Sequence, residues 1–507
     1  MRERPHDILF IAPGNHRAIY QGLAGTHAAL EPPIWAGLLA QAIRRQGYGV
    51  AIVDQEAEGM TAEQVARQAT AMSPRLIAVV VYGQQPSAST QTMTAAQEVC
   101  AQLRGMAFEG KTIVIGGHPS ALPALTLSDT QTDFVCQGEG VHTLLGLLRL
   151  RDHDDAAQLR TVPGLWFADE GRVQQTAAAP PVPSPDLAQE LPGMAWDLLP
   201  MPAYRAHNWH CFDHLNERQP YASLYTSLGC PYRCSFCCIN APFGKPSLRL
   251  WDPDCVIAEL DRLALDYGVV NLKIADEMFV LNERHVSRLC DLIVERGHRF
   301  NIWAYARVDS VQDHLLGKMK RAGFNWLCLG IESKSRYVRD GVQKGRYGEQ
   351  EIHDVVRRIK AAGIRVMGNY IFGLPDDDEA SMQDTLSLAL ELKCEMANFY
   401  SAMAYPGSPL YAMAVKEGWP LPERWHHYSQ HAYETLPLPT KFLTGGEVLS
   451  FRDWAWRQYF TDPGYLALVG HTFGQPVVDH LAELARITLP RRHAVHRDWM
   501  KGEPAHA

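Results

Sequence analysis

Short runs of apolar residues alternate with amphipathic segments along most of this chain of 507 residues. In residues 7–150 the runs are DILFIAP, GVAIVD, LIAVVVY, TIVIGG and DFVCQG. A run that is apolar on both faces is typical of a buried strand in a parallel sheet, and the segments between such strands form helices on both sides of it. The sequence therefore predicts an α/β fold with a doubly wound, Rossmann-like domain over residues 1–150.

The same alternation returns in residues 221–409. Six runs are present there: YASLYTSL, VVNLKIAD, FNIWAYAR, WLCLGIES, RVMGNYIFG and ANFYSAMA. Six βα units favour a partial (β/α)6 barrel over an open sheet. Residues 151–220 contain the proline-rich AAAPPVPSP and are interpreted as a linker at the domain junction. Residues 410–507 are rich in aromatic side chains and have a helical pattern, which predicts a C-terminal cap.

Composition narrows the class of protein. A net charge of −8 and a pI near 6.2 give no basic surface for nucleic acid, and no run of 18 apolar residues is present to span a membrane. The first residues lack the apolar core of a signal peptide. Eleven unevenly spaced cysteines are unlike a secreted disulfide framework. We therefore expect a cytoplasmic protein.

Four of these cysteines lie within nine residues, in the sequence GCPYRCSFCC. Cys230, Cys234 and Cys237 form a C-x3-C-x2-C motif directly after a predicted strand, and three thiolates on one loop suit a soft metal centre. Structural zinc requires four ligands, and no second cysteine pair is nearby. Cys238 is a poor fourth ligand because neighbouring side chains of an extended segment point apart. The favoured interpretation is a 4Fe–4S cluster with one open iron.

The motif and its position after the first barrel strand resemble the radical S-adenosylmethionine (SAM) superfamily. That resemblance implies that Cys230, Cys234 and Cys237 hold the cluster and that the open iron binds SAM, which is cleaved to a 5′-deoxyadenosyl radical. It also implies SAM contacts at the strand ends KIADEMF, YARVD, LGIES and GNYIFGLP. The cofactor-binding residues implied there are Phe236, Asp276, Glu277, Arg307, Glu332, Ser333 and Tyr370.

A doubly wound domain before such a barrel resembles the cobalamin-binding subclass of these enzymes. The loops QQPSAST, GGHPS and QGEG are similar to its cofactor loops. They imply cobalamin contacts from Gln85, Ser87, Ser89, Thr90, Gly116, Gly117, His118, Gly138 and Glu139. Many cobalamin domains use D-x-H-x-x-G, and Asp54 and Glu56 lie in a similar DQEAEG segment with glutamate in place of the histidine. We therefore expect cobalamin to bind without a histidine ligand from the protein.

The resemblance implies a methyltransferase that moves a methyl group from methylcobalamin to an unactivated carbon or phosphorus of a small-molecule or natural-product substrate. Two enzyme alternatives remain open: a ring contraction or cyclisation without methyl transfer, and a methylthiotransferase. The second is disfavoured because only Cys100 and Cys136 lie in the first domain, where such enzymes carry extra cluster ligands. A non-catalytic cobalamin or metal sensor would need no SAM pocket. The expected protein partner is an electron donor such as flavodoxin or ferredoxin.

Overall fold

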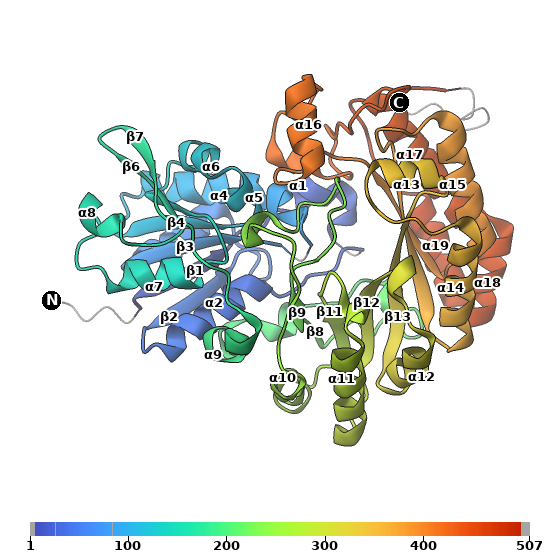
Figure 1. The fold of residues 1–507 in the computed structure, drawn as a ribbon, viewed down its shortest axis with the longest axis horizontal. Coiled ribbons are helices and arrows are strands. Elements are labelled where there is room, and N and C mark those ends of the chain that lie inside the picture. The colour runs from blue at the N-terminus through green and yellow to red at the C-terminus, as the bar shows by residue number, and fades with distance from the viewer. Residues whose placement is uncertain (1–5, 26, 84, 498–507) are drawn as a thin grey trace.

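The computed structural model describes residues 6–25, 27–83 and 85–497, which form two α/β units and a C-terminal helical segment (Figure 1). The first unit, blue to teal, lies on the left in Figure 1, and the second unit and the red C-terminal helices lie on the right. The two predicted alternating stretches correspond to these two units, so the predicted fold class is confirmed.

The first unit is built on a seven-stranded sheet with the order β2-β1-β3-β4-β5-β6-β7. The first five strands are parallel, and a helical connection leads from each of them to the next. The strands are β1 (Ile8–Ala12), β2 (Val50–Asp54), β3 (Leu76–Val81), β4 (Lys111–Gly116), β5 (Phe134–Cys136), β6 (Leu165–Asp169) and β7 (Arg172–Gln175). The antiparallel β6–β7 hairpin extends this sheet to Gln175, beyond the boundary expected at residue 150.

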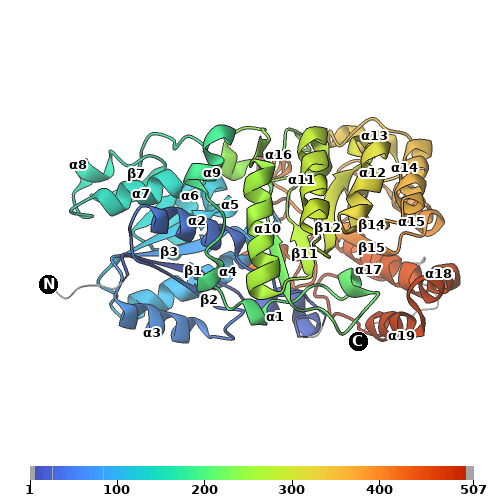
Figure 2. The ribbon, with the colours of Figure 1, turned by 90° about the horizontal axis from the view of Figure 1, so that it is seen from below.

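Helices cover both faces of this sheet, as Figure 2 also shows. Phe10 and Ala78 pack on the side of α2 and α7, whereas Leu9 and Ile77 pack on the side of α3 and α4. Adjacent strand residues therefore enter different cores, which explains why the runs are apolar throughout. The helices are α1 (His16–Tyr20), α2 (Ile34–Arg45), α3 (Ala62–Met72), α4 (Ala88–Gly105), α5 (Gly117–Ala121), α6 (Pro123–Thr130), α7 (Val141–Arg149) and α8 (Ala156–Leu159).

The second unit is a six-stranded parallel sheet with the order β15-β14-β13-β12-β11-β8, which is the chain order of its strands reversed. The strands are β8 (Tyr221–Leu224), β11 (Asn271–Ile274), β12 (Asn301–Arg307), β13 (Phe324–Glu332), β14 (Arg365–Phe372) and β15 (Met396–Ser401). The connecting helices are α10 (Pro253–Tyr267), α11 (Glu283–Arg296), α12 (Asp313–Arg321), α13 (Arg336–Gly341), α14 (Glu349–Ala361) and α15 (Glu379–Leu392). Consecutive βα units in this order form the predicted partial barrel. Cys290 of α11 is buried among its apolar residues, as the helical pattern predicts.

The segment between the two units packs against both of them. It includes α9 (Leu187–Glu190) and the fully buried Trp196. The indole of Trp196 donates a hydrogen bond to Glu259 of α10 (2.8 Å), and the backbone N–H of Ala195 donates to the carbonyl of Gly37 in α2 (3.1 Å). The segment thus joins the first unit to the second through direct contacts.

The C-terminal segment comprises α16 (Pro409–Glu417), the 3-10 turn η9 (Trp425–Tyr428), α17 (Gly445–Thr461), α18 (Pro463–Phe473) and α19 (Gln475–Ala485). Helix α17 packs on the barrel: the Phe451 and Phe372 rings lie 5.0 Å apart, and the Tyr459 hydroxyl donates to the Cys394 carbonyl (2.6 Å). The predicted helical cap is therefore present in this structure.

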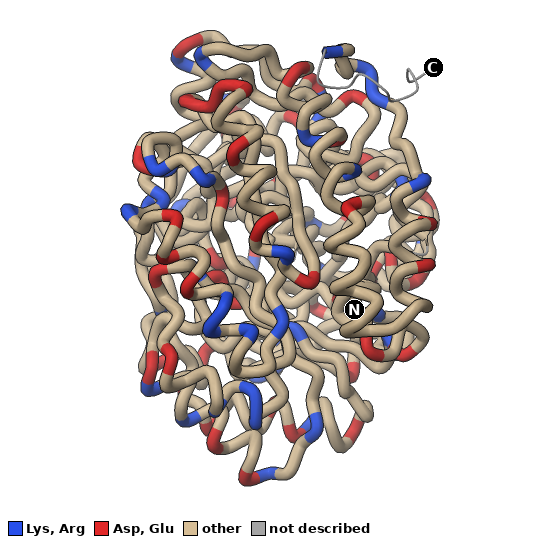
Figure 3. The backbone as a smooth tube through the Cα atoms, turned by 90° about the vertical axis from the view of Figure 1, so that its right-hand side faces the viewer, with Lys and Arg blue, Asp and Glu red and all other residues tan. Residues whose placement is uncertain are grey.

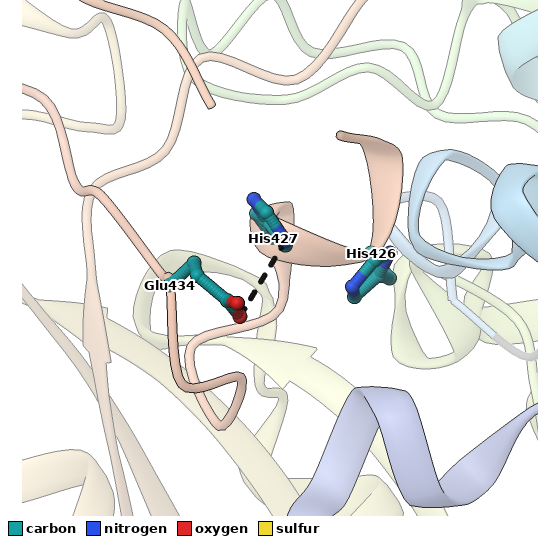
Figure 4. A group of neighbouring side chains, drawn as sticks. All are labelled: His426, His427 and Glu434. Atoms are coloured by element: carbon teal, nitrogen blue, oxygen red, sulfur yellow. Dashed lines mark ion pairs between the residues drawn. The ribbon is translucent and has the colours of Figure 1, made fainter. Parts of the chain in front are cut away.

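The turn η9 returns to the first unit, where the backbone N–H of His426 donates to the Thr94 hydroxyl of α4 (3.3 Å). In Figure 4, Glu434 lies on the His427 side of this turn, and its carboxylate is 3.5 Å from His427 Nε2. Possible ligand atoms of His426, His427 and Glu434 lie within 4.8 Å of one another, but one ring nitrogen of His426 is already 3.1 Å from the Thr94 hydroxyl. The two contacts of His426 with Thr94 anchor the C-terminal segment on the first unit.

The charged residues of the described chain are mixed in sign, and blue and red segments are interspersed in Figure 3. Within the described residues, no helix is both long and apolar enough to cross a membrane.

Candidate active site

A cavity of about 1430 Å³ lies where the two units and the C-terminal segment meet. Its lining includes Gln85 of the first unit, Cys237 of the cysteine loop, Glu277 and Glu332 of the barrel, and Arg452 of α17. These barrel residues follow the carboxyl ends of parallel strands, where α/β folds place their ligand sites. One cavity is therefore lined by the cysteine loop, by expected strand ends of the barrel and by the loop between β3 and α4 of the first unit.

The cysteine loop is bracketed by β9 (Ser227–Leu228) and β10 (Arg249–Leu250), which pair antiparallel. Gly229 starts the loop with φ +82°, and a Cβ there would lie 2.6 Å from the Ser247 carbonyl oxygen. The backbone N–H of Ser235 donates to the Val342 carbonyl (3.0 Å), and the N–H of Leu410 donates to the Ser235 carbonyl (2.8 Å). The loop is thus held from the barrel and from the C-terminal segment.

The thiols of Cys230, Cys234 and Cys237 are free, and burial raises the pKa of Cys230 to about 11. Thiolates in this loop therefore need a nearby positive charge. Arg307 supplies one: its guanidinium lies 3.4 Å from Cys234 Sγ and stacks 3.8 Å from the centre of the Tyr232 ring. Three free thiols beside a fixed cation are a donor set that fits an iron–sulfur cluster.

Arg307 makes further contacts within the protein. Two of its nitrogens donate to the Asp309 carboxylate, each at 2.9 Å, and it also bonds the Lys344 carbonyl. Arg307 is thus next to the cysteine loop, and contacts with Asp309 and with the Lys344 carbonyl fix the position of its guanidinium.

The two acidic residues after β11 have different surroundings. Asp276 accepts hydrogen bonds from the Thr226 backbone (2.6 Å), the Thr226 hydroxyl (2.5 Å) and the Ser227 hydroxyl (2.7 Å), and it does not line the cavity. Glu277 lines the cavity next to the cysteine loop. Its buried position raises the pKa of Glu277 to about 7, although Lys273 acts in the opposite direction. Of the two acidic residues, Glu277 is therefore the one available to a ligand.

Glu332 ends β13 in a strained conformation, with φ +67° and a register shift between Gly330 and Glu332. A non-glycine residue in this region costs about 1–3 kcal/mol, and such strain clusters at ligand sites. Its carboxylate lies 2.5 Å from Lys344 Nζ. Gly330 leaves room for this pair, because a Cβ there would lie 2.7 Å from Lys344 Nζ. The neighbouring Ser333 is fully buried, with its hydroxyl 3.3 Å from that of Thr385, and lies outside the cavity lining.

Of the remaining residues of the expected SAM site, Phe236 lines the cavity and the side chain of Tyr370 does not. Phe236 lines the cavity, and Lys344 Nζ lies 5.9 Å from its ring centre. On β14, Asn369 and Ile371 face the cavity, whereas Tyr370 between them points to the opposite side and stacks on Phe399 at 5.3 Å. Only the backbone of Tyr370 is therefore close to this space.

The glycines of the first unit form a cradle at the carboxyl ends of β3, β4 and β5. A Cβ on Gly116 would collide with the Val81 carbonyl oxygen, and Gly138 has φ +129°. Gly117, Tyr82 and Trp35 line a small second cavity that also touches Cys238. Gly116 is needed for this close contact with β3, whereas an added Cβ on Gly117 or Gly138 would meet no atom closer than 3.5 Å, so the backbone there leaves room for a ligand lying against it.

Some polar residues of these loops line the main cavity, and others are buried. Gln85 and Ser87 line the main cavity. Ser89 and Thr90 are buried: the Ser89 hydroxyl accepts from the backbone N–H of His118 (2.9 Å), and the Thr90 hydroxyl lies 3.3 Å from His118 Nδ1. Burial lowers the pKa of His118 to about 3, and its ring packs against Trp425 with centres 4.4 Å apart. The glycine cradle is thus supported by buried contacts among Ser89, Thr90 and His118.

Glu139 forms an ion pair with Arg249 of β10, and both side chains are buried. Its other oxygen accepts from the Val182 backbone N–H (2.8 Å), and Arg249 donates to the Val182 carbonyl (2.7 Å). The structure therefore gives Glu139 a place in the junction between the two units, beside the cysteine loop.

Asp54 ends β2 and Glu56 follows it. Strand β2 is an edge strand, whereas the order of the strands along the chain reverses between β1 and β3. Ligands of such sheets bind at that reversal point. Asp54 accepts from the Tyr204 hydroxyl (2.9 Å), and Glu56 accepts from the His16 backbone N–H (3.1 Å). Neither residue lines the main cavity, and no histidine follows at this strand end.

Sequence reasoning missed several residues of this site. Lys273 lies inside the barrel and forms an ion pair at 3.0 Å with Glu31 of the first unit, and Lys344 pairs with Glu332. The C-terminal segment contributes Arg452, which no motif marks. Lys273 is in the KIAD run, but an isolated lysine in a strand carries no signal of its partner.

The comparisons with known proteins agree with this geometry. Residues 20–148 match the family model of the B12 binding domain, and residues 224–389 match that of the radical SAM superfamily. An uncharacterised methyltransferase of Pyrococcus horikoshii is 29% identical over 424 residues, covering 83% of this chain and 86% of that protein. The anaerobic magnesium-protoporphyrin IX monomethyl ester cyclase of Cereibacter sphaeroides is 25% identical, covering 87% and 68%.

Among solved structures, the cobalamin-dependent radical SAM enzyme OxsB with aqua-cobalamin and SAM bound superposes with a TM-score of 0.67. The alignment covers 95% of this chain and 72% of that one at 16% identity, which supports the fold. The cysteine loop, the glycine cradle and both family models agree. The chain is a radical SAM enzyme with an N-terminal cobalamin-binding domain, and its cofactors are a 4Fe–4S cluster, SAM and cobalamin.

Proposed function

We propose that this protein is a methyltransferase that delivers a methyl group to an unactivated carbon, or to phosphorus, of a small-molecule substrate. The observation that supports this function most is the single cavity, which is lined by the cysteine loop, by barrel strand ends and by the β3–α4 loop of the cobalamin-binding domain. A substrate in this cavity lies between both cofactor sites. Methyl transfer to a carbon without a lone pair requires this arrangement, since the carbon must be activated and methylated in one place.

When bound, the cluster with SAM supplies hydrogen-atom abstraction, and cobalamin supplies the methyl group. The protein's own residues bind the cofactors and orient them. Glu277 and the Glu332–Lys344 pair offer charged groups to the polar parts of SAM, and Phe236 offers an apolar face. Arg307 balances thiolate charge at Cys234.

The cavity wall is also suited to exclude water. Trp303, Tyr305 and Tyr400 line it from the barrel, and the C-terminal segment contributes further lining residues such as Trp456. Burial keeps both tyrosine hydroxyls protonated, because it raises their pKa values above the ordinary range. Aromatic surfaces of this kind around a cavity help to keep water away from a reactive substrate.

We place the protein in the cytoplasm, with a flavodoxin- or ferredoxin-type protein as its electron donor. The eleven free cysteines suit a reducing compartment. Reduction of the cluster needs a one-electron donor, and a flavodoxin- or ferredoxin-type protein would supply that electron.

A second candidate function is cyclisation without methyl transfer, which one relative's name favours: the cyclase of Cereibacter sphaeroides aligns with 87% of this chain. The two functions share the radical step and differ in the fate of the methyl group. They are therefore separable by following a labelled methyl.

The test uses anaerobically reconstituted protein, labelled SAM and a small-molecule extract as the source of acceptor. We expect deoxyadenosine and a product that carries the label, detected by mass spectrometry. Cys234→Ala should lose cluster iron and deoxyadenosine formation, whereas the control Cys255→Ala, at an exposed position on α10, should retain both. Deoxyadenosine without any labelled product would overturn methyl transfer and favour cyclisation. Unchanged deoxyadenosine in Cys234→Ala would overturn the cluster assignment.

A further inference from the structure

The charges around the cavity are divided between its two ends. At the barrel end the acidic residues Glu277 and Glu332 line the cavity. The lysines there are paired with acidic residues, Lys344 with Glu332 and Lys273 with Glu31. The wall made by the C-terminal segment instead contributes four arginines and one acidic residue among the described lining residues, which are Arg452, Asp453, Arg457, Arg486 and Arg491. This wall therefore has an excess of positive charge.

The single acidic residue is already shared between two arginines. Arg491 donates to both oxygens of Asp453, at 2.8 and 3.0 Å, and Arg452 donates to one of them at 2.7 Å. Burial alone would raise the pKa of Asp453, but the two guanidinium groups outweigh it and hold the pKa below its ordinary range. Asp453 is thus ionised and fully engaged with Arg452 and Arg491, and this group of one carboxylate and two guanidinium groups keeps a net positive charge.

A neutral polar group completes the wall. His431 lines the cavity, and burial together with the charges of Arg452 and Arg491 lowers its pKa far below the ordinary value. Its Nδ1 is buried and has no hydrogen-bond partner among the described residues. Buried polar atoms are normally paired, so a ligand in the cavity is a natural partner for this nitrogen.

The same segment also provides apolar surface next to the arginines. Leu481, Leu484, Ile487 and Leu489 line the cavity together with Trp456. A ligand that satisfies this wall needs an apolar body beside a negatively charged group, because positive charge in a partly desolvated cavity is stabilised by an anion.

We infer that the substrate is an amphipathic organic anion, whose carboxylate, phosphate or phosphonate group is held by the C-terminal arginine wall while its apolar part extends toward the cofactors. This inference rests on the proposed function, because it names the class of substrate for that same cavity. Guanidinium groups suit such a ligand because their planar donors match carboxylate and phosphate oxygens.

The test measures binding of two probes that differ by one charged group. Equilibrium dialysis of the full-length, cofactor-loaded protein compares 8-anilinonaphthalene-1-sulfonate with N-phenyl-1-naphthylamine, which has the same rings without the sulfonate. We expect the anionic probe to bind at least about tenfold more tightly, since a hydrogen bond to a charged group contributes that much. Arg486→Gln and Arg457→Gln should each remove most of this preference and leave the neutral probe unchanged.

The matched control is Arg492→Gln, which removes a neighbouring exposed arginine that is not part of the cavity lining and should change neither probe. Equal binding of the two probes, or an anion preference that survives both lining variants, would overturn the inference. Deoxyadenosine formation is measured in the same samples. If the radical chemistry is absent and the anion preference is intact, the proposed function fails alone; the converse result refutes only the substrate class.

Discussion

The turn that starts the cysteine loop provides a sharp test of how the cluster site is built. Gly229 has φ +82°, and a Cβ at this position would lie 2.6 Å from the Ser247 carbonyl oxygen. Ordinary contacts of a Cβ are at about 3.4 Å or more, so the two backbone segments must separate by nearly 1 Å in Gly229→Ala. This separation would displace the residue directly before Cys230.

The expected cost has two parts. A side chain in the left-handed region costs about 1–2 kcal/mol, and forcing extra atoms into a packed site adds about 1–3 kcal/mol. Gly244 offers a matched control at the other side of the same loop, because it also has a positive φ (+71°) but nothing lies within 4 Å of its added Cβ. Gly244→Ala should therefore show only the first part of the cost.

The assay is thermal unfolding of the two variants, combined with iron content after anaerobic reconstitution. A difference of about 1–3 kcal/mol corresponds to about 2–12 °C for a unit of this size. We expect Gly229→Ala to melt lower than Gly244→Ala by that amount and to retain less iron. Equal melting temperatures and equal iron content in the two variants would refute the reasoning.

Two further predictions concern groups outside the cavity. Arg249→Ala leaves Glu139 buried without its charged partner and should lower the free energy of unfolding by about 3–5 kcal/mol in urea denaturation; a loss under about 1 kcal/mol would contradict the proposed role of this pair. Asp377 is buried and accepts from the Ser381 hydroxyl (2.6 Å) and the Leu374 N–H (3.0 Å), and burial raises its pKa to about 7. Because the folded state then binds the proton more tightly than the unfolded state, this residue's contribution to stability is present at low pH and is lost as the pH rises from about 4 to 7. Asp377→Asn should therefore gain stability relative to the unmodified protein over this range, by up to about 1.4 kcal/mol per pH unit, and a flat difference would exclude the shift.

The strands of the sheets and the three cysteines of one loop could be predicted because each of these features is a local pattern in the sequence. Runs such as LIAVVVY are apolar on both faces and lie in β3, and the C-x3-C-x2-C spacing already indicates three ligands on one loop. The strand ends then place Glu277 and Glu332 in the cavity. Periodicity predicts the strands, whereas the choice of Glu277 and Glu332 as site residues came from the resemblance to the radical SAM superfamily.

The roles of individual side chains were less accessible. Asp276 and Glu277 are adjacent in one motif, yet Asp276 is turned toward Thr226 and only Glu277 reaches the cavity. Glu139 lies in a glycine-rich loop that resembles a cofactor loop, and its partner Arg249 is 110 residues away. Such pairings depend on the packing of distant segments, which no local spacing encodes.

The origin of the arginine wall has a consequence for how proteins of this kind diversify. The two family models end at residues 148 and 389, whereas the arginines of the wall lie between residues 452 and 491. The family models that contain the expected cofactor loops and the segment that carries the arginine wall are therefore encoded by separate parts of the gene. If the inferred arginine wall binds the substrate, changes confined to residues 452–491 alter the choice of substrate while the cysteine loop and the glycine cradle keep their sequence.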